Sequence, residues 1–192
     1  MTNENVHLLP HDRLLERTLL RVIPHDVRPN HVTILRILLT PLVLYYVWNE
    51  VWHIAVPLFL FAALTDVIDG SLARTRKQIT VWGTIADPVA DKLLIGSVVL
   101  LFVAHEINPV FAGVILFMEV MIIMTAIIRR KRRGEYISAN WAGKVKMFLQ
   151  CLGVTALLVA RWSGLDLFVP VSIGTLSLAI MFALVSLYTY GL

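Results

Sequence analysis

The sequence predicts an all-α integral membrane protein with six transmembrane helices, an N-terminal amphipathic surface helix and both termini in the cytoplasm. Of the 192 residues, 58% are hydrophobic and 16% are charged, whereas soluble domains average roughly 45–50% apolar and about 25% charged residues. The mean hydropathy is +0.76. These values exclude a disordered chain and an ordinary cytosolic enzyme, and the single Cys151 excludes a disulfide scaffold. The third indication is a series of apolar runs, each long enough to cross a bilayer.

Residues 1–30 are predicted to be a cytoplasmic juxtamembrane segment that precedes a six-helix membrane domain of residues 31–192. Arg13, Arg17 and Arg21 alternate there with leucines, which is typical of a short amphipathic helix on the membrane surface. A solvated leader explains the same pattern, and both interpretations stay open.

Six apolar runs follow, each close to the length that spans the hydrocarbon core. They cover residues 32–48, 51–72, 84–104, 109–128, 145–162 and 167–190. Pro41 and Pro57 lie within the first two runs, where neighbouring helices can satisfy the carbonyl that a proline frees. We therefore expect six transmembrane helices in one domain.

The basic residues predict the orientation of these helices. With the N-terminus inside, 16 of the 17 lysines and arginines fall on the cytoplasmic side, and Arg161 alone falls outside. This is the positive-inside pattern, and an even number of spans returns the C-terminus to the cytoplasm. The net charge of +4 suits anionic lipid or nucleic acid, and the hydropathy favours the bilayer, so no nucleic-acid partner is expected.

Four aspartates lie at adjoining ends of the second and third predicted spans. Asp66 and Asp69 are three residues apart and Asp87 and Asp91 four apart, so each pair shares a helix face. Four such residues facing lipid at the bilayer centre would cost on the order of 10–14 kcal/mol, so we expect a wet cavity near the cytoplasmic face. Helix capping at the interface would explain one or two of them, but not four.

Carboxylates in this pattern favour a divalent-cation site. Cations would cancel their mutual repulsion, and carboxylates without nearby histidine or cysteine favour magnesium or manganese. Two such ions could clamp a pyrophosphate and stabilise the leaving phosphate. The small residues Gly70, Ala73 and Gly83 lie on or near the same stripe and would let a ligand approach the backbone, although helix packing also favours small residues. Arg74 could pair with phosphate or anchor the helix on the inner side.

These residues resemble the signature of the CDP-alcohol phosphotransferase family at each of its fixed positions. Those positions are Asp66, Asp69, Gly70, Ala73, Arg74, Gly83, Asp87 and Asp91. The resemblance extends to the six-helix layout and to four residues at the first span: Pro29, Asn30, Thr33 and Arg36. It therefore covers most of the chain.

The resemblance implies a homodimeric enzyme of the inner, cytoplasmic membrane, with its active site facing the cytoplasm. The implied reaction transfers the phosphatidyl group of CDP-diacylglycerol to an alcohol and releases CMP. Two Mg²⁺ or Mn²⁺ ions are implied, one held by Asp66, Asp69 and Asp87 and the other by Asp66, Asp87 and Asp91. Asp91 is also implied as the general base. The implied donor contacts are Asn30, Thr33, Gly70, Ala73, Arg74, Thr80 and Gly83.

The start of the fifth span is similar to bacterial phosphatidylglycerophosphate synthases, which implies glycerol 3-phosphate as the acceptor. The similar residues are Gly143, Lys144, Lys146 and Gln150. Lys144, Lys146, Arg129 and Arg130 are candidate ligands of the acceptor phosphate, although anionic lipid headgroups could also engage this basic region. Residues two apart diverge by about 200° on a helix, so only one of the two lysines is expected to touch the phosphate.

Two departures from the subfamily pattern leave the acceptor open. The subfamily usually carries Arg-Glu in the fourth span, where this chain has Met118 and Glu119, and it usually carries threonine where Met147 stands. Glu119 is a candidate acceptor residue that we expect to pair with a basic side chain. Phosphatidylglycerol, as in a cardiolipin synthase, inositol phosphate and serine remain alternative acceptors.

Two other classes fit the sequence less well. Intramembrane prenyltransferases also use aspartates and magnesium, but they need a second aspartate-rich motif, and the sequence has no further aspartate pair at such spacing. A divalent-cation transporter should carry acids through the depth of the bilayer, whereas here only Glu119 is predicted to lie deep.

Overall fold

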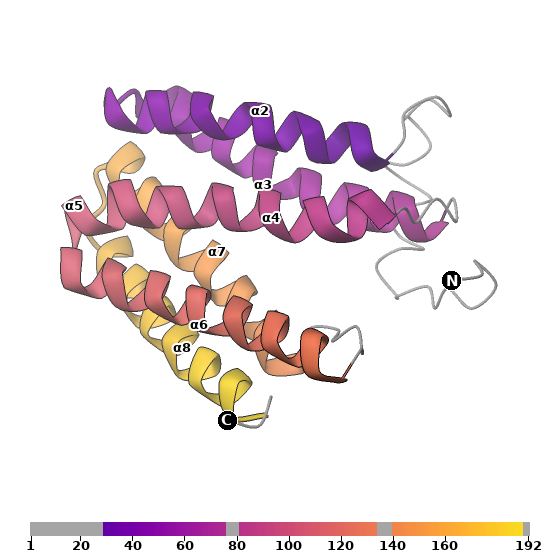
Figure 1. Cartoon of the computed structure of the whole chain (residues 1–192). Helices are drawn as coiled ribbons and strands as arrows, with labels where there is room; N and C mark the ends of the chain where they lie inside the picture. Colours follow the sequence, from indigo (N-terminus) through magenta and orange to yellow (C-terminus); the bar gives the residue numbers. More distant parts are fainter. Residues whose placement is uncertain (1–28, 76–80, 134–139, 190–192) are drawn as a thin grey trace. The chain divides into compact units, whose positions relative to one another are not determined.

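A computed structural model describes residues 29–75, 81–133 and 140–189, which are almost entirely helical (Figure 1). The predicted surface helix within residues 1–28 lies outside the described residues. The helices are α2 (Pro29–Trp48), α3 (Trp52–Thr75), α4 (Val81–Val98), the π-helical turn η2 (Val99–Val103), α5 (Ala104–Glu106), α6 (Pro109–Arg133), α7 (Trp141–Ser163) and α8 (Phe168–Thr189).

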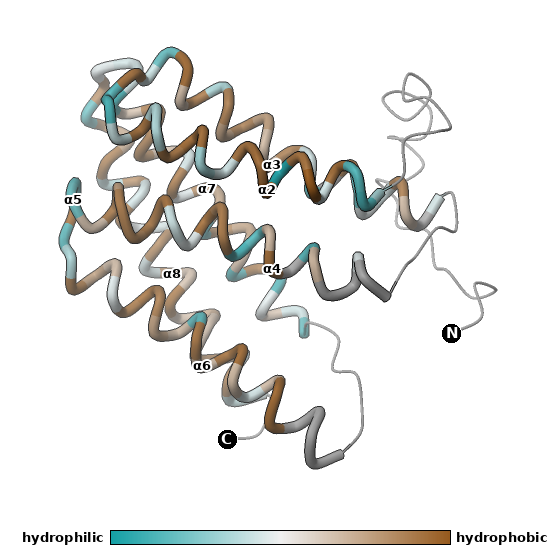
Figure 2. The backbone as a smooth tube through the Cα atoms, turned by 45° about the horizontal axis from the view of Figure 1, so that its top comes forward, coloured by the Kyte–Doolittle hydropathy of each residue, from teal (hydrophilic) through white to brown (hydrophobic). Residues whose placement is uncertain are grey.

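The all-α class is confirmed, and each predicted apolar run coincides with a helix or, for residues 84–104, with α4, η2 and α5. Within the described residues, five helices are long and apolar enough to cross a membrane: α2, α3, α6, α7 and α8. The helix α4 carries Asp87, Asp91 and Lys92 within its 18 residues and is therefore more polar. Figure 2 shows hydrophobic helices interrupted by short hydrophilic stretches. Six crossings and their orientation stay predictions.

The described helices group into two compact units. One contains the described parts of Met1–Tyr46 and Pro57–Leu94, and hence most of α2, α3 and α4. The other contains Val47–Val56 and the described parts of Ile95–Leu192, and hence the connection from α2 to α3 and the helices from η2 to α8. We call them the α2–α4 unit and the α6–α8 unit.

In the α2–α4 unit, one face of α2 is polar although it is buried. Thr33, Arg36 and Thr40 are three and four residues apart, so they share this face, and they are 0%, 0% and 7% exposed. Apolar side chains such as Phe59 and Leu72 of α3 are completely buried in the same unit. Polar groups buried in this way need hydrogen-bond or ionic partners, because an unpaired one is costly.

In the α6–α8 unit, α7 and α8 lie side by side, and α8 also contacts α6 (Figure 1). Asn140 caps α7 by accepting a hydrogen bond from the Gly143 backbone, and its amide donates to the carbonyl of Ser186 on α8. At the other end, Gly164 adopts the left-handed conformation (φ 69°) that ends α7. Both ends of this helical hairpin are thus defined by specific residues.

The helices α7 and α8 approach each other closely at Gly153. A Cβ atom there would stand 2.7 Å from Cγ of Leu176 and 2.8 Å from Oγ1 of Thr175. We expect Gly153→Ala to lower the free energy of unfolding by roughly 1–2 kcal/mol, since overpacking outweighs the helix propensity that alanine gains. Thermal unfolding in detergent measures this, with Gly113→Ala as the matched control. Gly113 of α6 has no atom within 4 Å of the added Cβ, so the control should be neutral or stabilising. An unchanged melting temperature for Gly153→Ala would contradict the packing.

Candidate active site

The four predicted aspartates come together inside the α2–α4 unit. Asp66 and Asp69 lie near the C-terminal end of α3, and Asp87 and Asp91 lie in the N-terminal half of α4. The hydroxyl of Thr33 contacts both helices, at 2.6 Å from Oδ1 of Asp87 and 3.4 Å from Oδ2 of Asp69. The two carboxylate pairs, which are far apart in sequence, therefore face the same side of α2.

The guanidinium of Arg36 lies at the centre of these carboxylates. Its Nη1 donates to Oδ1 of Asp66 at 2.9 Å and to Oδ1 of Asp91 at 3.1 Å, and its Nη2 donates to Oδ2 of Asp69 at 2.5 Å. Its Nε donates to the hydroxyl of Thr65 at 3.3 Å. One side chain of α2 thus joins α3 to α4. We call Arg36 and the four aspartates the aspartate cluster.

The cluster is buried on one side and open on the other. The side chain of Arg36 is 0% exposed and that of Asp69 is 2% exposed, whereas Asp91 and Asp66 are 11% and 30% exposed. Four aspartate side chains face one guanidinium, so acidic groups outnumber basic ones in this partly buried setting. The cluster therefore attracts further cations, and Asp66 is its most accessible carboxylate among these three.

The chemistry of this donor set fits a hard divalent cation. Carboxylate oxygens are the ligands that Mg²⁺ and Mn²⁺ prefer, and two helices supply four carboxylates here. Within the described residues, no three acidic, histidine or cysteine side chains already surround one point as they would around an ion. Three of the carboxylates instead converge on Arg36.

The predicted donor-binding residues fall into three groups. Thr33 is completely buried and contacts the aspartates directly. Gly83 is buried, whereas Asn30, Gly70 and Ala73 are half-buried. Thr80 lies outside the described residues, as does the side chain of Arg74.

The predicted acceptor residues lie in the α6–α8 unit. Lys146 of α7 is 6% exposed and forms an ion pair with Glu119 of α6, as expected for a glutamate at this depth. The second carboxylate oxygen of Glu119 is buried without a partner among the described residues. Lys144 is exposed, so the two lysines diverge as their spacing predicts. The side chains of Arg129 and Arg130 lie outside the described residues.

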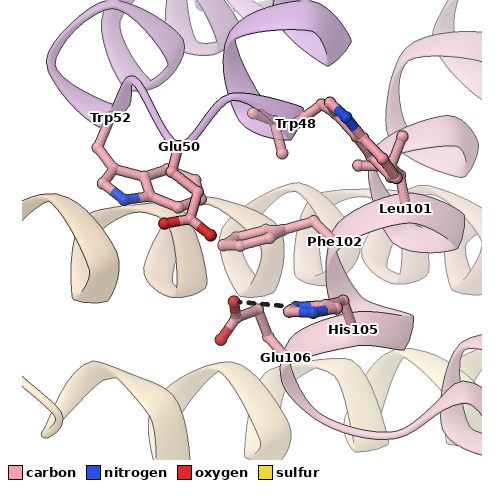
Figure 3. A pocket seen from close by; sticks show the side chains of 8 residues that line it. Trp48, Glu50, Trp52, Leu101, Phe102, His105 and Glu106 are labelled. Carbon is pink, nitrogen blue, oxygen red and sulfur yellow. Dashed lines mark hydrogen bonds and ion pairs between the residues drawn. The ribbon is translucent and has the colours of Figure 1, made fainter.

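A cavity of about 180 Å³ lies elsewhere, at the α2–α3 connection within the α6–α8 unit (Figure 3). The carboxylates of Glu50 and Glu106 point toward the ring of Phe102, and Trp52 packs on that ring at 5.2 Å between centroids. Glu106 also pairs with Arg161. The residues that line the cavity include no lysine or arginine, so it does not suit a phosphorylated ligand. The aspartate cluster remains the candidate active site.

The pairing of Arg36 with the aspartates was not predicted from the sequence. In the sequence this arginine belongs to the motif at the first span and to the basic residues of the inner side, and neither pattern predicts a contact with the aspartates. The signal was present, because Thr33 and Arg36 are three residues apart on a helix that is mostly apolar. A charged side chain inside such a helix is a functional candidate whose partner should be sought among opposite charges.

The family model described as CDP-alcohol phosphatidyltransferase matches residues 26–188. The chain belongs to this family. The match includes every helix from α2 to α7 and nearly all of α8, and hence the whole aspartate cluster. CDP-alcohol phosphatidyltransferases are generally dependent on divalent metal ions, in agreement with the donor set of the cluster.

Three relatives are similar to this chain over different shares of its length. A Bacillus subtilis protein named CDP-diacylglycerol–glycerol-3-phosphate 3-phosphatidyltransferase is 28% identical over 177 residues, which cover 84% of this chain and 92% of that protein. A Rickettsia felis protein of the same name is 30% identical, covering 71% of this chain and 78% of its own length. A Drosophila melanogaster protein named probable cardiolipin synthase (CMP-forming) is 33% identical, covering 53% of this chain and 32% of that protein.

Proposed function

We propose that this CDP-alcohol phosphatidyltransferase transfers the phosphatidyl group of CDP-diacylglycerol to glycerol 3-phosphate, forming phosphatidylglycerophosphate and CMP. The observation that supports this most is the set of four carboxylates on the family's signature positions, three of which pair with Arg36 while the fourth accepts from Thr33. Full-length similarity to a relative named for this reaction supports the choice of acceptor.

In this proposal the aspartates have separate roles. Asp66, Asp69 and Asp87 would hold one Mg²⁺ or Mn²⁺ ion, and Asp66, Asp87 and Asp91 would hold a second. When bound, the two ions supply positive charge that polarises the donor pyrophosphate and stabilises the leaving phosphate. Gly70 and Gly83, which have no side chain, are proposed donor contacts, together with Asn30, Thr33, Ala73, Arg74 and Thr80.

Asp91 is the proposed general base. It would take the proton of the acceptor hydroxyl as that oxygen attacks the phosphorus that carries the diacylglycerol. The bond from this phosphorus to the bridging oxygen of CMP breaks, and CMP leaves with the electron pair. Among the described contacts, Arg36 donates to Oδ1 of Asp91. The side chain of Asp91 is 11% exposed, so a bound acceptor could reach it.

The acceptor phosphate is an anion, so we expect a cationic side chain to bind it. Lys146 is the proposed partner, and Glu119 orients its ammonium group. Lys144, Arg129 and Arg130 are proposed to supply further positive charge at the same end of α6 and α7.

The membrane arrangement is also part of the proposal. The chain is an integral membrane protein by the length and composition of its helices. We infer that it crosses the cytoplasmic membrane six times, with the aspartate cluster on the cytoplasmic side, where CDP-linked donors and glycerol 3-phosphate would reach it. We also infer a homodimer. Only 11% of the most apolar window of α6 is buried within the chain, which leaves apolar surface for lipid and for a second copy.

A cardiolipin synthase reaction, with phosphatidylglycerol as the acceptor, is the second candidate. It is favoured by the similarity to the Drosophila relative of that name, which covers about half of this chain, and by Met118 in place of the usual arginine.

An acceptor panel tests the choice between these reactions. Purified protein in mixed micelles is given CDP-diacylglycerol and Mn²⁺ with glycerol 3-phosphate, phosphatidylglycerol, inositol phosphate or serine, and CMP release is measured. We expect glycerol 3-phosphate to support the fastest release. Release with phosphatidylglycerol alone would replace the proposal by the second candidate.

Replacing Lys146 tests the acceptor site. We expect Lys146→Met to raise the KM for glycerol 3-phosphate by about tenfold or more, since charge-assisted hydrogen bonds contribute about 1.5–3 kcal/mol. The KM for CDP-diacylglycerol should change little. The control Arg161→Gln breaks a different ion pair of the same unit, with Glu106, and should change neither constant.

The single variant leaves Glu119 buried without a partner, which can destabilise the fold by about 3–5 kcal/mol. The double variant Glu119→Gln/Lys146→Met removes both charges. It therefore separates the loss of acceptor binding from the destabilisation that an unpaired Glu119 causes. If the double variant regains the wild-type KM for glycerol 3-phosphate, Lys146 does not bind the acceptor.

A further inference from the structure

Arg36 is a buried residue that connects three helices at the aspartate cluster. It is completely buried, and from α2 it reaches Asp66 and Asp69 on α3 and Asp91 on α4. Removing one partner of a buried ion pair costs about 3–5 kcal/mol, because the other charge is left uncompensated. The Nε bond to the Thr65 hydroxyl holds the same side chain independently of the carboxylates.

Arg36 contacts one oxygen of each carboxylate: Oδ1 of Asp66, Oδ2 of Asp69 and Oδ1 of Asp91. A carboxylate has two oxygens, so it can accept from a guanidinium with one and coordinate a metal ion with the other. Bonds of this kind, from an outer group to a metal ligand, orient the ligand, and losing one typically weakens metal affinity about 10- to 100-fold.

Arg36 could have either of two roles if a metal ion binds at the aspartate cluster. Arg36 could stand in for a metal ion and leave when the ion binds, or it could stay and orient the ligands. Its complete burial and its bond to Thr65 favour staying. The number of acidic groups favours it as well, because four aspartates outnumber the single arginine, so Arg36 does not have to leave for the cluster to suit a divalent ion.

We propose that Arg36 is a positioning residue that fixes the carboxylates of Asp66, Asp69 and Asp91 in the orientation that binds divalent ions, and that it stays in place when they bind. This inference rests on the proposed metal-dependent function and names the residue of this chain that prepares the site for it.

Mn²⁺ binding to the full-length protein in detergent tests the role directly, through the EPR signal of free Mn²⁺. Arg36→Lys keeps the charge and all four carboxylates but loses the planar fork that reaches three of them at once. We expect its dissociation constant for Mn²⁺ to rise about 10- to 100-fold. The matched control is Arg161→Lys, at an arginine that pairs with Glu106 outside the cluster, and it should bind Mn²⁺ like the wild type.

Saturating Mn²⁺ should restore most of the CMP release of Arg36→Lys, because its metal ligands are intact. A purely structural role would lower the amount of folded protein and leave the Mn²⁺ affinity of the folded fraction unchanged. Equal Mn²⁺ affinity in Arg36→Lys and wild type would therefore overturn the proposal, and so would tighter binding, which would show that Arg36 competes with the ion.

Thr65→Val decides the question if Arg36→Lys does not fold. Valine is similar in size and removes only the hydroxyl that holds Nε of Arg36. We expect a smaller loss of Mn²⁺ affinity in the same direction, and an unchanged affinity would overturn the role of Arg36. Absence of Mn²⁺ binding in the wild-type protein would instead overturn the proposed metal-dependent function itself.

Discussion

Asp66→Asn should lower the rate of CMP release about a thousandfold, because stabilisation by a metal ion is worth several kcal/mol and each 1.36 kcal/mol is about tenfold in rate. Asp66 is assigned to both ions, and it is more exposed than Asp69 or Asp91. Asparagine keeps an oxygen that can accept from Arg36, so the three-helix contact should survive while the negative charge is lost.

The matched control for this variant is Asp166→Asn. Asp166 is an exposed residue between α7 and α8, in the other unit, and its replacement should leave CMP release unchanged. Circular dichroism and size-exclusion chromatography confirm that both variants fold. If Asp66→Asn kept more than about a tenth of the wild-type rate, a loss of less than about 1.4 kcal/mol, Asp66 would not bridge two ions.

Asp91→Asn should lower kcat by about 100- to 10,000-fold, the usual contribution of a general base. Donor affinity should be little changed, because the proposed donor contacts are made by other residues. Since Asp91 is also a proposed ligand of the second ion, its kcat is measured at saturating Mn²⁺. Recovery of the wild-type kcat under that condition would make Asp91 a metal ligand only, and another group would have to take the proton.

The helices and the spacing of the site residues could be predicted from the sequence, because both are local properties. Apolar runs of about 20 residues predict helices of the observed length, and spacings of three and four residues place each aspartate pair on one helix face. The opposite directions of Lys144 and Lys146 followed from the same helical geometry, and the structure indeed leaves one exposed and the other buried.

The contacts between helices could not be predicted in the same way. That Arg36 lies among Asp66, Asp69 and Asp91 depends on how α2 packs on α3 and α4, and its position in the sequence fitted a positive-inside anchor equally well. The π-helical turn η2 is also invisible to hydropathy, since all five of its residues are apolar. Glu50 adopts a positive φ of 57° at the turn after α2, where a glycine would have signalled the turn and a glutamate does not.

Incorporation of radiolabelled glycerol 3-phosphate into lipid tests the central claim most directly. The purified wild-type protein is incubated with CDP-diacylglycerol and Mn²⁺, with and without excess chelator, and chloroform-soluble label and CMP are both measured. The proposal predicts a labelled phospholipid that carries the acceptor phosphate, formed in equal amount to CMP and lost in chelator. No labelled lipid with Mn²⁺ present, or undiminished labelling in chelator, would contradict it.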